Sequence, residues 1–305
     1  MSRRRSGRDI HGIVLLDKPV GLSSNQALQK ARRLLQARKA GHTGTLDPFA
    51  TGMLPVCFGE ASKTAFFMGD ASKCYRATAM LGRSTDSGDT EGVVLRELPV
   101  PELDGAQIEA VLSRFRGTIS QTPPMYSAIK HQGQPLYKLA RQGIEIERPS
   151  RPVTVFRLEL LAWQSPLMSF EVECSKGTYI RTLAEDVCRA LGTCGHLNTL
   201  RRLSVEPFTE QQMITLDQLE QAVAQDRGEA LLLPVDAGLR GWPCCQLDEV
   251  AAEAFSHGNP VTHSADRGMI RVYDQCNRIL GLGELSIDRL LHPRRVFVAA
   301  LPGSG

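Results

Sequence analysis

The segment at residues 41–63, GHTGTLDPFATGMLPVCFGEASK, constrains the fold most, because it fits neither the helical nor the strand period. Its four glycines, two prolines and three threonines predict a long loop of defined shape, with at most a strand over residues 53–58. Long ordered loops in compact domains are usually functional. This segment is therefore the first candidate for a functional site.

Asp47 lies in this loop directly before Pro48, and the proline favours an extended backbone at the aspartate. Two interpretations follow. The carboxylate can close an Asx-turn by accepting hydrogen bonds from backbone amides two residues further on. It can instead be presented to a substrate as a catalytic group. The local sequence leaves both interpretations open.

The composition is that of an ordinary globular protein. The chain has 305 residues, 42% hydrophobic and 23% charged, which suggests about two domains. No stretch approaches the roughly 20 consecutive apolar residues of a membrane span. The basic amino terminus, MSRRRSGRD, is not followed by an apolar segment of signal-peptide length. We therefore expect a cytoplasmic protein that does not enter a membrane.

Several common site chemistries are absent from the sequence. Eight cysteines in a chain of 305 residues without a secretion signal predict reduced thiols, and no C-x-x-C pair is present. Cys188, Cys194 and His196 form a small cluster, but their spacing fits no zinc template and a fourth ligand is missing, so we predict no metal site.

The chain has no P-loop, dinucleotide-binding glycine motif, H-E-x-x-H or G-x-S-x-G. The sequence therefore lacks the motifs that usually indicate nucleotide hydrolysis, nicotinamide redox chemistry, zinc proteolysis or esterase chemistry.

Positive charge is concentrated at the amino-terminal end. Residues 1–40 hold ten basic and two acidic residues, whereas the whole chain has a net charge of only +3. This asymmetry fits a surface that binds a polyanion. It also fits a solvated basic face with an arginine-rich tail, and charge alone does not separate the two.

The pattern after the amino terminus predicts a strand followed by a helix. A buried strand is expected to end at Lys18 and Pro19 and to turn through Gly21. Ser23 or Ser24 then caps a helix with an apolar stripe. The opposite face of that helix is basic and consists of Lys30, Arg32, Arg33, Arg38 and Lys39.

Further elements follow from the periodicity. We expect strands over residues 75–81, 153–160 and 170–174, a helix over 106–115, a polar turn at 83–92 and a helix-bearing insertion at 122–152. An apolar stripe predicts a helix that ends at Gly192 and carries Arg181 in its first turn, near the end of the preceding strand. A β-rich module, joined through 234–243, is expected to have strands over 268–273, 279–284 and 296–300 and a helix over 249–255.

Four collinear blocks resemble a known family: LLDKPVGLSS at 15–24, the segment 41–63, KGTYIRTLAED at 176–186 and LRRL at 200–203. They resemble the TruB family, the bacterial tRNA pseudouridine synthases that act on uridine 55 of the TψC arm. The resemblance covers residues 11–235 and, more loosely, the C-terminal module. Phe49 departs from the family pattern, in which leucine is common, and we expect the change to affect packing rather than chemistry.

The resemblance implies an α+β fold. Its core is a mixed, largely antiparallel sheet flanked by helices, followed by a small β-rich C-terminal domain that is PUA-like and binds RNA. Residues 1–10 would be a basic tail and residues 11–235 the catalytic domain. An RNA-binding insertion would lie at about 122–152, and residues 243–305 would form the PUA-like domain.

The resemblance also implies three catalytic residues. Asp47 would be the nucleophile and Arg181 its ion-pair partner, although Arg181 taken alone also fits a surface residue. Because a nearby guanidinium lowers the pKa of a carboxylate, we expect Arg181 to keep Asp47 ionised and aimed. Tyr75 would stack on the target uracil, close to where a proton must move. Taken alone, Tyr75 and Tyr179 also fit core aromatics.

The remaining implied residues bind substrate or support the site. Tyr179 and Leu200 would line the pocket, and His42 would fill the gap left in the T loop when the base is flipped out. As a loop residue, His42 also fits a histidine bonded to backbone. Support of the site is expected from Lys18, Pro19, Gly44 and Thr45.

The implied reaction needs no cofactor, because it breaks the N1 glycosidic bond, rotates the uracil and rejoins it through C5 without net oxidation, hydration or group transfer. The expected partner is the T-arm stem-loop of tRNA, without a guide RNA or a membrane, and we expect a monomer. Two alternatives stay open. One is a non-catalytic module that binds or helps fold tRNA, and the other is a guide-dependent synthase of the archaeal and eukaryotic type.

Overall fold

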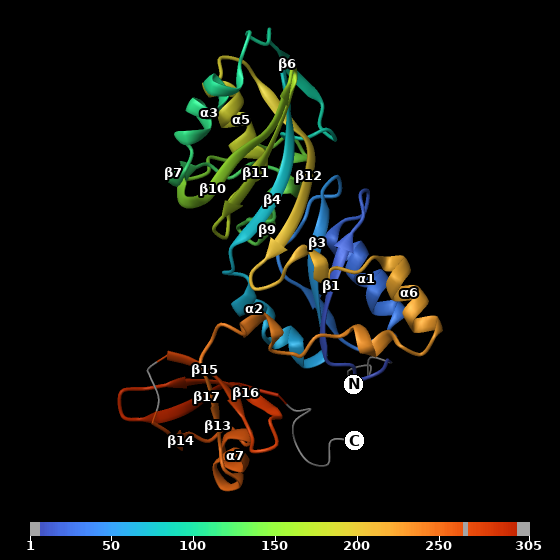
Figure 1. Ribbon diagram of the computed structural model, residues 1–305, viewed down its shortest axis with the longest axis vertical. Helices are drawn as coiled ribbons and strands as arrows, with labels where there is room; N and C mark the ends of the chain where they lie inside the picture. Colours follow the sequence, from blue (N-terminus) through green and yellow to red (C-terminus); the bar gives the residue numbers. More distant parts are fainter. Residues whose placement is uncertain (1–6, 265–267, 298–305) are drawn as a thin grey trace.

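The computed structural model describes residues 7–264 and 268–297. Its centre is a sheet with the spatial order β1-β3-β12-β4-β11-β10-β7 and with β2 beside β3 (Figure 1). All pairs are antiparallel except β12 with β3. The strands are β1 (Gly12–Lys18), β2 (Ala40–His42), β3 (Thr51–Phe58), β4 (Lys73–Leu81), β7 (Gly117–Gln121), β10 (Arg151–Gln164), β11 (Leu167–Cys174) and β12 (Gly195–Val205). The predicted mixed, largely antiparallel sheet is confirmed.

Helices flank this sheet, as expected. The α-helices in the described part are α1 (Ser24–Leu34), α2 (Ala65–Met68), α3 (Gly105–Ser113), α4 (Leu136–Ala140), α5 (Ile180–Ala190), α6 (Leu216–Ala224) and α7 (Glu249–Ser256). Short 3-10 helices lie at Gly59–Lys63, Glu210–Gln212, Gly228–Leu231 and Ala237–Leu239. Figure 1 shows α3 and α5 beside the strands β10 and β11, and α1 and α6 beside β1.

The cap of α1 is Ser23 rather than Ser24. The Ser23 hydroxyl accepts from the Gln26 N–H at 3.2 Å, and the Gln26 side chain accepts from the Ser23 N–H at 2.8 Å. This capping box satisfies donors that the helix itself leaves unpaired. Ser24 is therefore free for the second role described below.

Alternation along β1 separates two apolar clusters, since successive side chains of a strand point to opposite faces. Val14 and Leu16 pack with α1 and α6. Ile13 and Leu15 pack on the other face, where Phe297 of the C-terminal module joins them. A third cluster joins the strands β4, β10, β11 and β12 to α3 and α5. The sheet is thus covered on both faces near β1.

The central strand β12 was not predicted as a strand. It pairs antiparallel with β4 along its length and parallel with β3 at Arg201↔Thr51 and Arg202↔Gly52. Arg202 is only 1% exposed and interrupts the apolar pattern that marks a buried strand. Its Nε donates to the Met53 carbonyl oxygen at 2.7 Å and its Nη2 to the Gly44 carbonyl oxygen at 2.9 Å.

Two other segments contain more structure than expected. The predicted polar turn at 83–92 begins with β5 (Arg83–Thr85), which pairs with β6 (Val94–Glu97). The insertion at 122–152 holds the predicted helix, α4, and also a short hairpin of β8 (Lys130–His131) and β9 (Gln134–Pro135). Strands this short carry too little sequence pattern to be recognised.

The C-terminal module is a sheet of order β13-β15-β16-β17-β14 with α7 packed against it. Its strands are β13 (Cys244–Gln246), β14 (Val261–Thr262), β15 (Gly268–Tyr273), β16 (Ile279–Leu285) and β17 (Leu290–Val296). Of the strand expected over 296–300, Val296 is the last residue of β17 and Phe297 is not in a strand. Residues 298–300 lie outside the described part, as do residues 1–6 of the expected basic tail and residues 301–305 of the expected PUA-like domain.

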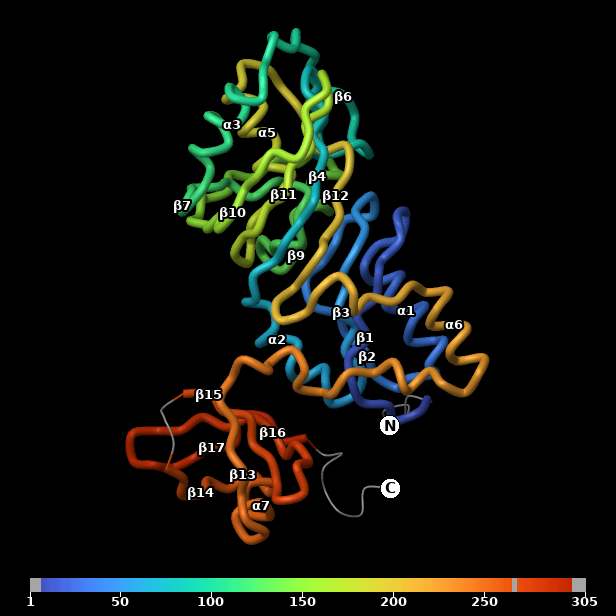
Figure 2. The backbone as a smooth tube through the Cα atoms, viewed as in Figure 1, coloured from blue at the N-terminus to red at the C-terminus, as the bar shows by residue number. Residues whose placement is uncertain are grey.

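Before it enters this module, the chain passes beside β1 a second time. Figure 2 shows it passing from β12 through α6 and back across the lower end of the sheet. Ile13 and Leu233 exchange backbone hydrogen bonds of 2.9 and 2.8 Å there. At the entry to the module, Arg271 Nη1 lies 3.0 Å from Asp236 Oδ2.

All eight cysteines lie in the described part of the chain and are free thiols there. Within the described residues, no helix is long and apolar enough to cross a membrane.

Replacing Gly52 with alanine tests the contact between β3 and β12. Gly52 has a φ of +97°, and an added Cβ would lie 2.2 Å from the Arg202 carbonyl oxygen. We expect Gly52→Ala to lower the free energy of unfolding in urea by about 2–4 kcal/mol. Gly41→Ala is the matched control, since nothing lies within 4 Å of its added Cβ, and it should change stability by less than about 0.5 kcal/mol. Equal stability of the two variants would contradict the packing described.

Candidate active site

The predicted site residues meet around a cavity of about 300 Å³. Its walls come from the loop that carries Asp47, the first residues of β4, the insertion, the turn before α5 and the middle of β12. Of the ten residues implied by sequence, those that line the cavity are Gly44, Thr45, Asp47, Tyr75, Tyr179, Arg181 and Leu200. Lys18 and Pro19 lie behind the loop, and His42 lies outside the cavity.

The loop that carries Asp47 is fastened on both sides to the connection between β1 and α1. Ser24 Oγ donates to the Leu46 carbonyl oxygen at 3.0 Å and accepts from the Leu46 N–H at 2.7 Å. On the other side, the Pro48 carbonyl oxygen accepts from the Gly21 N–H at 2.8 Å. Both neighbours of Asp47 are therefore held in place, which fixes where the carboxylate is presented.

Lys18 strengthens the same connection from inside the protein. It is fully buried, and its Nζ donates to the carbonyl oxygens of Pro19 at 2.9 Å, Leu22 at 2.6 Å and Pro48 at 3.3 Å. Burial lowers the pKa of Lys18 to about 8, and the Asp47 carboxylate opposes this shift. A buried ammonium with three carbonyl partners holds the turn and the Asp47 loop together.

Asp47 and Arg181 form the predicted ion pair, with Arg181 Nε 3.0 Å from Asp47 Oδ2. Arg181 extends from the first turn of α5 and is 4% exposed, whereas the Asp47 side chain is 35% exposed and lines the cavity. Among the described residues, the Asp47 carboxylate accepts no backbone hydrogen bond. The Asx-turn interpretation is therefore excluded, and the carboxylate is presented to the cavity.

The other donors of Arg181 are also occupied. Its Nη1 donates to the Ser87 carbonyl oxygen at 2.6 Å and its Nη2 to the Tyr126 carbonyl oxygen at 2.6 Å. Asp89 Oδ2 lies 3.7 Å from Nη1. The planar guanidinium is thus held by three segments, and this fixes the direction in which its Nε points at Asp47.

Arg181 lowers the pKa of Asp47, as expected, but it does not set the net direction of the shift. Burial raises the pKa of Asp47 above its ordinary value, and this effect exceeds the opposing effect of Arg181. The carboxylate of Asp89 raises the pKa further, whereas Lys18 lowers it. Removing a carboxylate from water disfavours its charged form, and one ion pair does not offset that here.

Two aromatic residues and a leucine form the apolar walls. Tyr75, on β4, is 8% exposed, and burial raises the pKa of its hydroxyl while Arg202 opposes that shift. Leu200 lies on β12, one strand away. Tyr179 directly precedes α5, and its backbone is held by Gln121 through hydrogen bonds of 2.8 and 3.0 Å. These walls suit a flat, partly polar ligand.

The three remaining predicted residues occupy different places. Gly44 has a φ of +68°, and its carbonyl oxygen accepts from Arg202, as described above. Thr45 is exposed at the cavity rim. His42 lies on β2, half-buried, and its Nδ1 has no hydrogen-bond partner among the described residues. Burial lowers the pKa of His42, with a smaller contribution from Arg202, so its imidazole is neutral at pH 7.

Sequence reasoning missed several residues that shape the site. The sequence predicts Ser24 only as a helix cap and does not point to Gln121. Asp89 lies in the predicted polar turn, and Arg202 was quoted only as part of the LRRL block. Lys73 also lines the cavity, and burial lowers its pKa to about 8. The acidic residues clustered at 83–92 and the second arginine of LRRL were the available signals.

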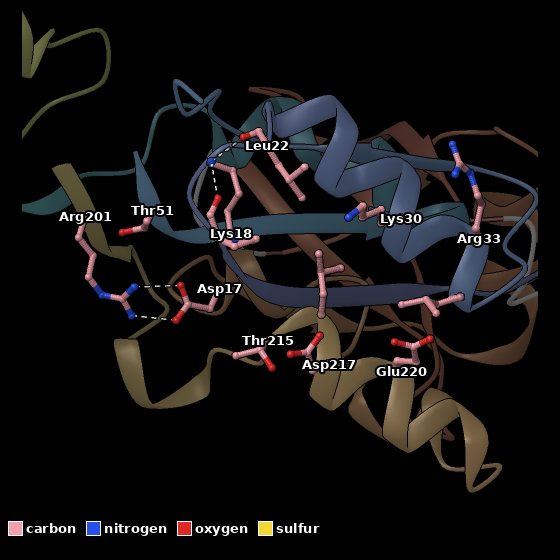
Figure 3. Close-up of a pocket in the computed structure, with 13 residues that line it drawn as sticks. Asp17, Lys18, Leu22, Lys30, Arg33, Thr51, Arg201, Thr215, Asp217 and Glu220 are labelled. Carbon is pink, nitrogen blue, oxygen red and sulfur yellow. Dashed lines mark hydrogen bonds and ion pairs between the residues drawn. The ribbon is translucent and has the colours of Figure 1, made fainter. Parts of the chain in front are cut away.

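A larger cavity, of about 730 Å³, lies between α1 and α6 (Figure 3). Figure 3 shows Lys30 and Arg33 on α1, and Asp217 and Glu220 on α6, along its sides. Its strongest interaction is internal: Arg201 donates to both carboxylate oxygens of Asp17 at 2.9 Å. Neither Asp47 nor Arg181 lines this cavity, so the smaller cavity remains the candidate active site.

Groups of side chains that would hold a metal ion are not found in residues 7–264 and 268–297. No three His, Cys, Asp or Glu side chains there are arranged as ligands.

Comparison with protein families matches nearly the whole chain. The model described as TruB family pseudouridylate synthase (N terminal domain) matches residues 32–180. The models described as tRNA pseudouridylate synthase B C-terminal domain and as Pseudouridine synthase II TruB, C-terminal, match residues 181–240 and 243–297.

Among solved structures, the chain is similar to one in a Cbf5-Nop10-Gar1 complex, with a TM-score of 0.74, 25% identity and coverage of 94% of this chain and 85% of that one. A chain of an H/ACA RNP bound to a substrate RNA containing 2′-deoxyuridine has a TM-score of 0.73 at 22% identity, covering 99% and 92%. The second of these likenesses shows the fold alone.

Two proteins named tRNA pseudouridine synthase B are similar over their full length. The one from Pseudomonas fluorescens (strain Pf0-1) is 51% identical over 298 residues, which cover 96% of this chain and 97% of that protein. The one from Pseudomonas aeruginosa (strain UCBPP-PA14) is 50% identical, covering 96% and 98%. With about half of its residues shared over nearly its entire length, the chain belongs to the TruB family of pseudouridylate synthases.

Proposed function

We propose that this chain converts uridine to pseudouridine at position 55, in the TψC loop of tRNA, with Asp47 as the nucleophile. One observation carries the proposal: an aspartate paired at 3.0 Å with a buried arginine lines a cavity that also has aromatic walls. The cavity has the size of a small-ligand pocket. It therefore fits a single nucleotide rather than a segment of folded RNA.

The reaction requires a carboxylate that attacks covalently and then leaves. In the ionised form, Asp47 attacks the nucleotide, and the N1 glycosidic bond breaks while the bond between C1′ and C5 forms. The C5 proton is lost and N1 gains a proton, so the atoms balance without a cofactor. Attack at C6 of the uracil and attack at C1′ of the ribose both begin from the same ionised carboxylate. Arg181 holds that carboxylate in position through its own fixed contacts.

The walls of the cavity support the binding of a flipped base. Tyr75 offers a ring for stacking, and Leu200 and Tyr179 enclose the base from other sides. A base inside a folded loop reaches such a cavity only after flipping, which costs a few kcal/mol of unstacking. We propose that the neutral ring of His42, outside the cavity, fills the gap that the base leaves in the RNA.

Contacts to the RNA backbone offset the cost of flipping. The residues Lys30, Arg32, Arg33 and Lys39 on and after α1 form no ion pair with any described residue, so their charges are available to phosphates. We propose the same role for the insertion at 122–152 and for the C-terminal module as a PUA-like domain. On this proposal residues 11–235 form the catalytic domain, and residues 243–305 bind RNA without catalysing the reaction.

We propose that the substrate is bare tRNA and that no guide RNA is needed. The similar complex structures contain Cbf5, Nop10 and Gar1, whereas the relatives named tRNA pseudouridine synthase B match this chain at twice that identity. Lys18, Pro19, Gly44 and Thr45 then serve as supports: the first two fix the connection behind Asp47, and the other two form the loop in front of it.

Asp47→Asn tests the function directly. The purified chain should release tritium from a tRNA transcript labelled at C5 of uridine, and mass-shift mapping after derivatisation should place pseudouridine at position 55. Asp47→Asn should lower the rate by at least about a thousandfold, because an amide is not a nucleophile, and leave RNA affinity within about twofold. Asp217→Asn, in the cavity of Figure 3, is the matched control and should keep full activity. Binding without tritium release from the unaltered chain would support the non-catalytic alternative.

Tyr75→Phe separates stacking from the role of the hydroxyl. The phenylalanine ring keeps the stacking surface, whereas the hydroxyl beside Arg202 is lost. We expect the single-turnover rate to fall by more than about tenfold, with a smaller change in the dissociation constant of the RNA. A variant with a normal rate and weakened binding would assign Tyr75 to binding alone.

The pH profile tests the raised pKa of Asp47. Only the ionised carboxylate attacks, so activity falls as the pH drops through the pKa of Asp47. Because that pKa is raised, the acidic limb of kcat/KM should lie above pH 3.8. Asp89→Asn removes a charge that raises this pKa, so it should move the limb to lower pH. A limb that Asp89→Asn leaves in place would show that another group controls it.

A further inference from the structure

The insertion at 122–152 meets the turn at 83–92 through one side-chain hydrogen bond. The Tyr126 hydroxyl donates to Asp86 Oδ2 at 3.0 Å. The other carboxylate oxygen of Asp86 accepts from the N–H of Val93, directly after the same turn, at 2.8 Å. Asp86 is thus already fixed by its own turn, and it offers the insertion an acceptor whose position is set.

Tyr126 also reaches the active site through its backbone. Its carbonyl oxygen accepts from Arg181 Nη2 at 2.6 Å, while Arg181 Nη1 donates to the Ser87 carbonyl oxygen at 2.6 Å. Arg181 therefore bridges the insertion and the turn at 83–92. The Tyr126–Asp86 hydrogen bond joins the same two segments at the protein surface.

The insertion forms few other hydrogen bonds with the rest of the described chain. Residues 123–149 form two hydrogen bonds to the rest of the described chain, and both involve Tyr126: its hydroxyl donates to Asp86, and its carbonyl oxygen accepts from Arg181. The next residue, Ser127, is 5% exposed and lines the cavity, and its hydroxyl has no partner within the described ranges. The position of Tyr126 consequently decides where one wall of the cavity lies.

We propose that Tyr126 is a positioning residue: the hydrogen bond from its hydroxyl to Asp86 locks the insertion onto the turn at 83–92. Its carbonyl oxygen is thereby held where Arg181 needs an acceptor, and Arg181 stays aligned with Asp47. The role in catalysis rests on the function proposed above. The locking of the insertion does not, because it is a property of the free protein.

The chemistry of the bond agrees with this role. The hydrogen bond to Asp86 raises the pKa of Tyr126, so the phenol remains a protonated donor. Asp86 is exposed to solvent, and water competes for its carboxylate. The effect of losing the bond is therefore that of one hydrogen bond, about fivefold in an equilibrium or a rate.

Tyr126→Phe and Tyr137→Phe test the proposal as a matched pair. Tyr137 lies in α4, in the same insertion, and its hydroxyl makes no hydrogen bond to a described residue. Hydrogen–deuterium exchange of residues 122–152 is measured in the free protein. The single-turnover rate is measured at saturating tRNA, together with the dissociation constant. We expect Tyr126→Phe to speed exchange and to slow turnover about fivefold with little change in RNA affinity, and Tyr137→Phe to do neither.

Asp86→Ala closes a double-mutant cycle. If the hydrogen bond is the lock, the double variant turns over no more slowly than Asp86→Ala alone, because the bond is already lost. Additive losses, or unchanged exchange and rate in Tyr126→Phe, overturn the proposal. If the unaltered chain does not modify tRNA, the proposed function fails. The exchange data then still decide whether Tyr126 locks the insertion.

Discussion

Two buried guanidinium groups organise the candidate active site, because a buried cationic donor must find acceptors. Removing one partner of a buried ion pair costs about 3–5 kcal/mol. Arg202 takes the carbonyl oxygens of Met53 and Gly44, and Arg181 takes Asp47 and two carbonyl oxygens from other segments. Segments that are far apart in the sequence converge there since each of them supplies an oxygen atom to one of the two arginines.

The same arrangement explains why the charge state of Asp47 is not set by its partner alone. Withdrawal from water and the neighbouring Asp89 carboxylate favour the neutral acid, while Arg181 and Lys18 favour the ion. Burial is the largest of these effects. The sequence predicts the lowering effect of the arginine correctly, but it does not show the burial that outweighs this effect.

Local pattern predicted much of the fold, and family likeness predicted much of the site. The end of β1 at Lys18 and the helix after it follow from proline, glycine and serine chemistry that acts over a few residues. The strand β12 was missed because Arg202 occupies a buried position whose acceptors lie about 150 residues away in sequence. Asp89 was missed for a related reason: its proximity to Arg181 exists only after β12 and α5 have packed.

Consecutive serines at the start of α1 divide two tasks between them. Ser23 caps the helix, and the Ser24 hydroxyl forms hydrogen bonds with both backbone polar atoms of Leu46, its N–H and its carbonyl oxygen. A residue inserted between Ser23 and Ser24 would rotate the second hydroxyl by about 100° around the helix axis relative to the cap. The direct succession of the two serines therefore fixes how the basic helix is oriented relative to the loop that lines the cavity.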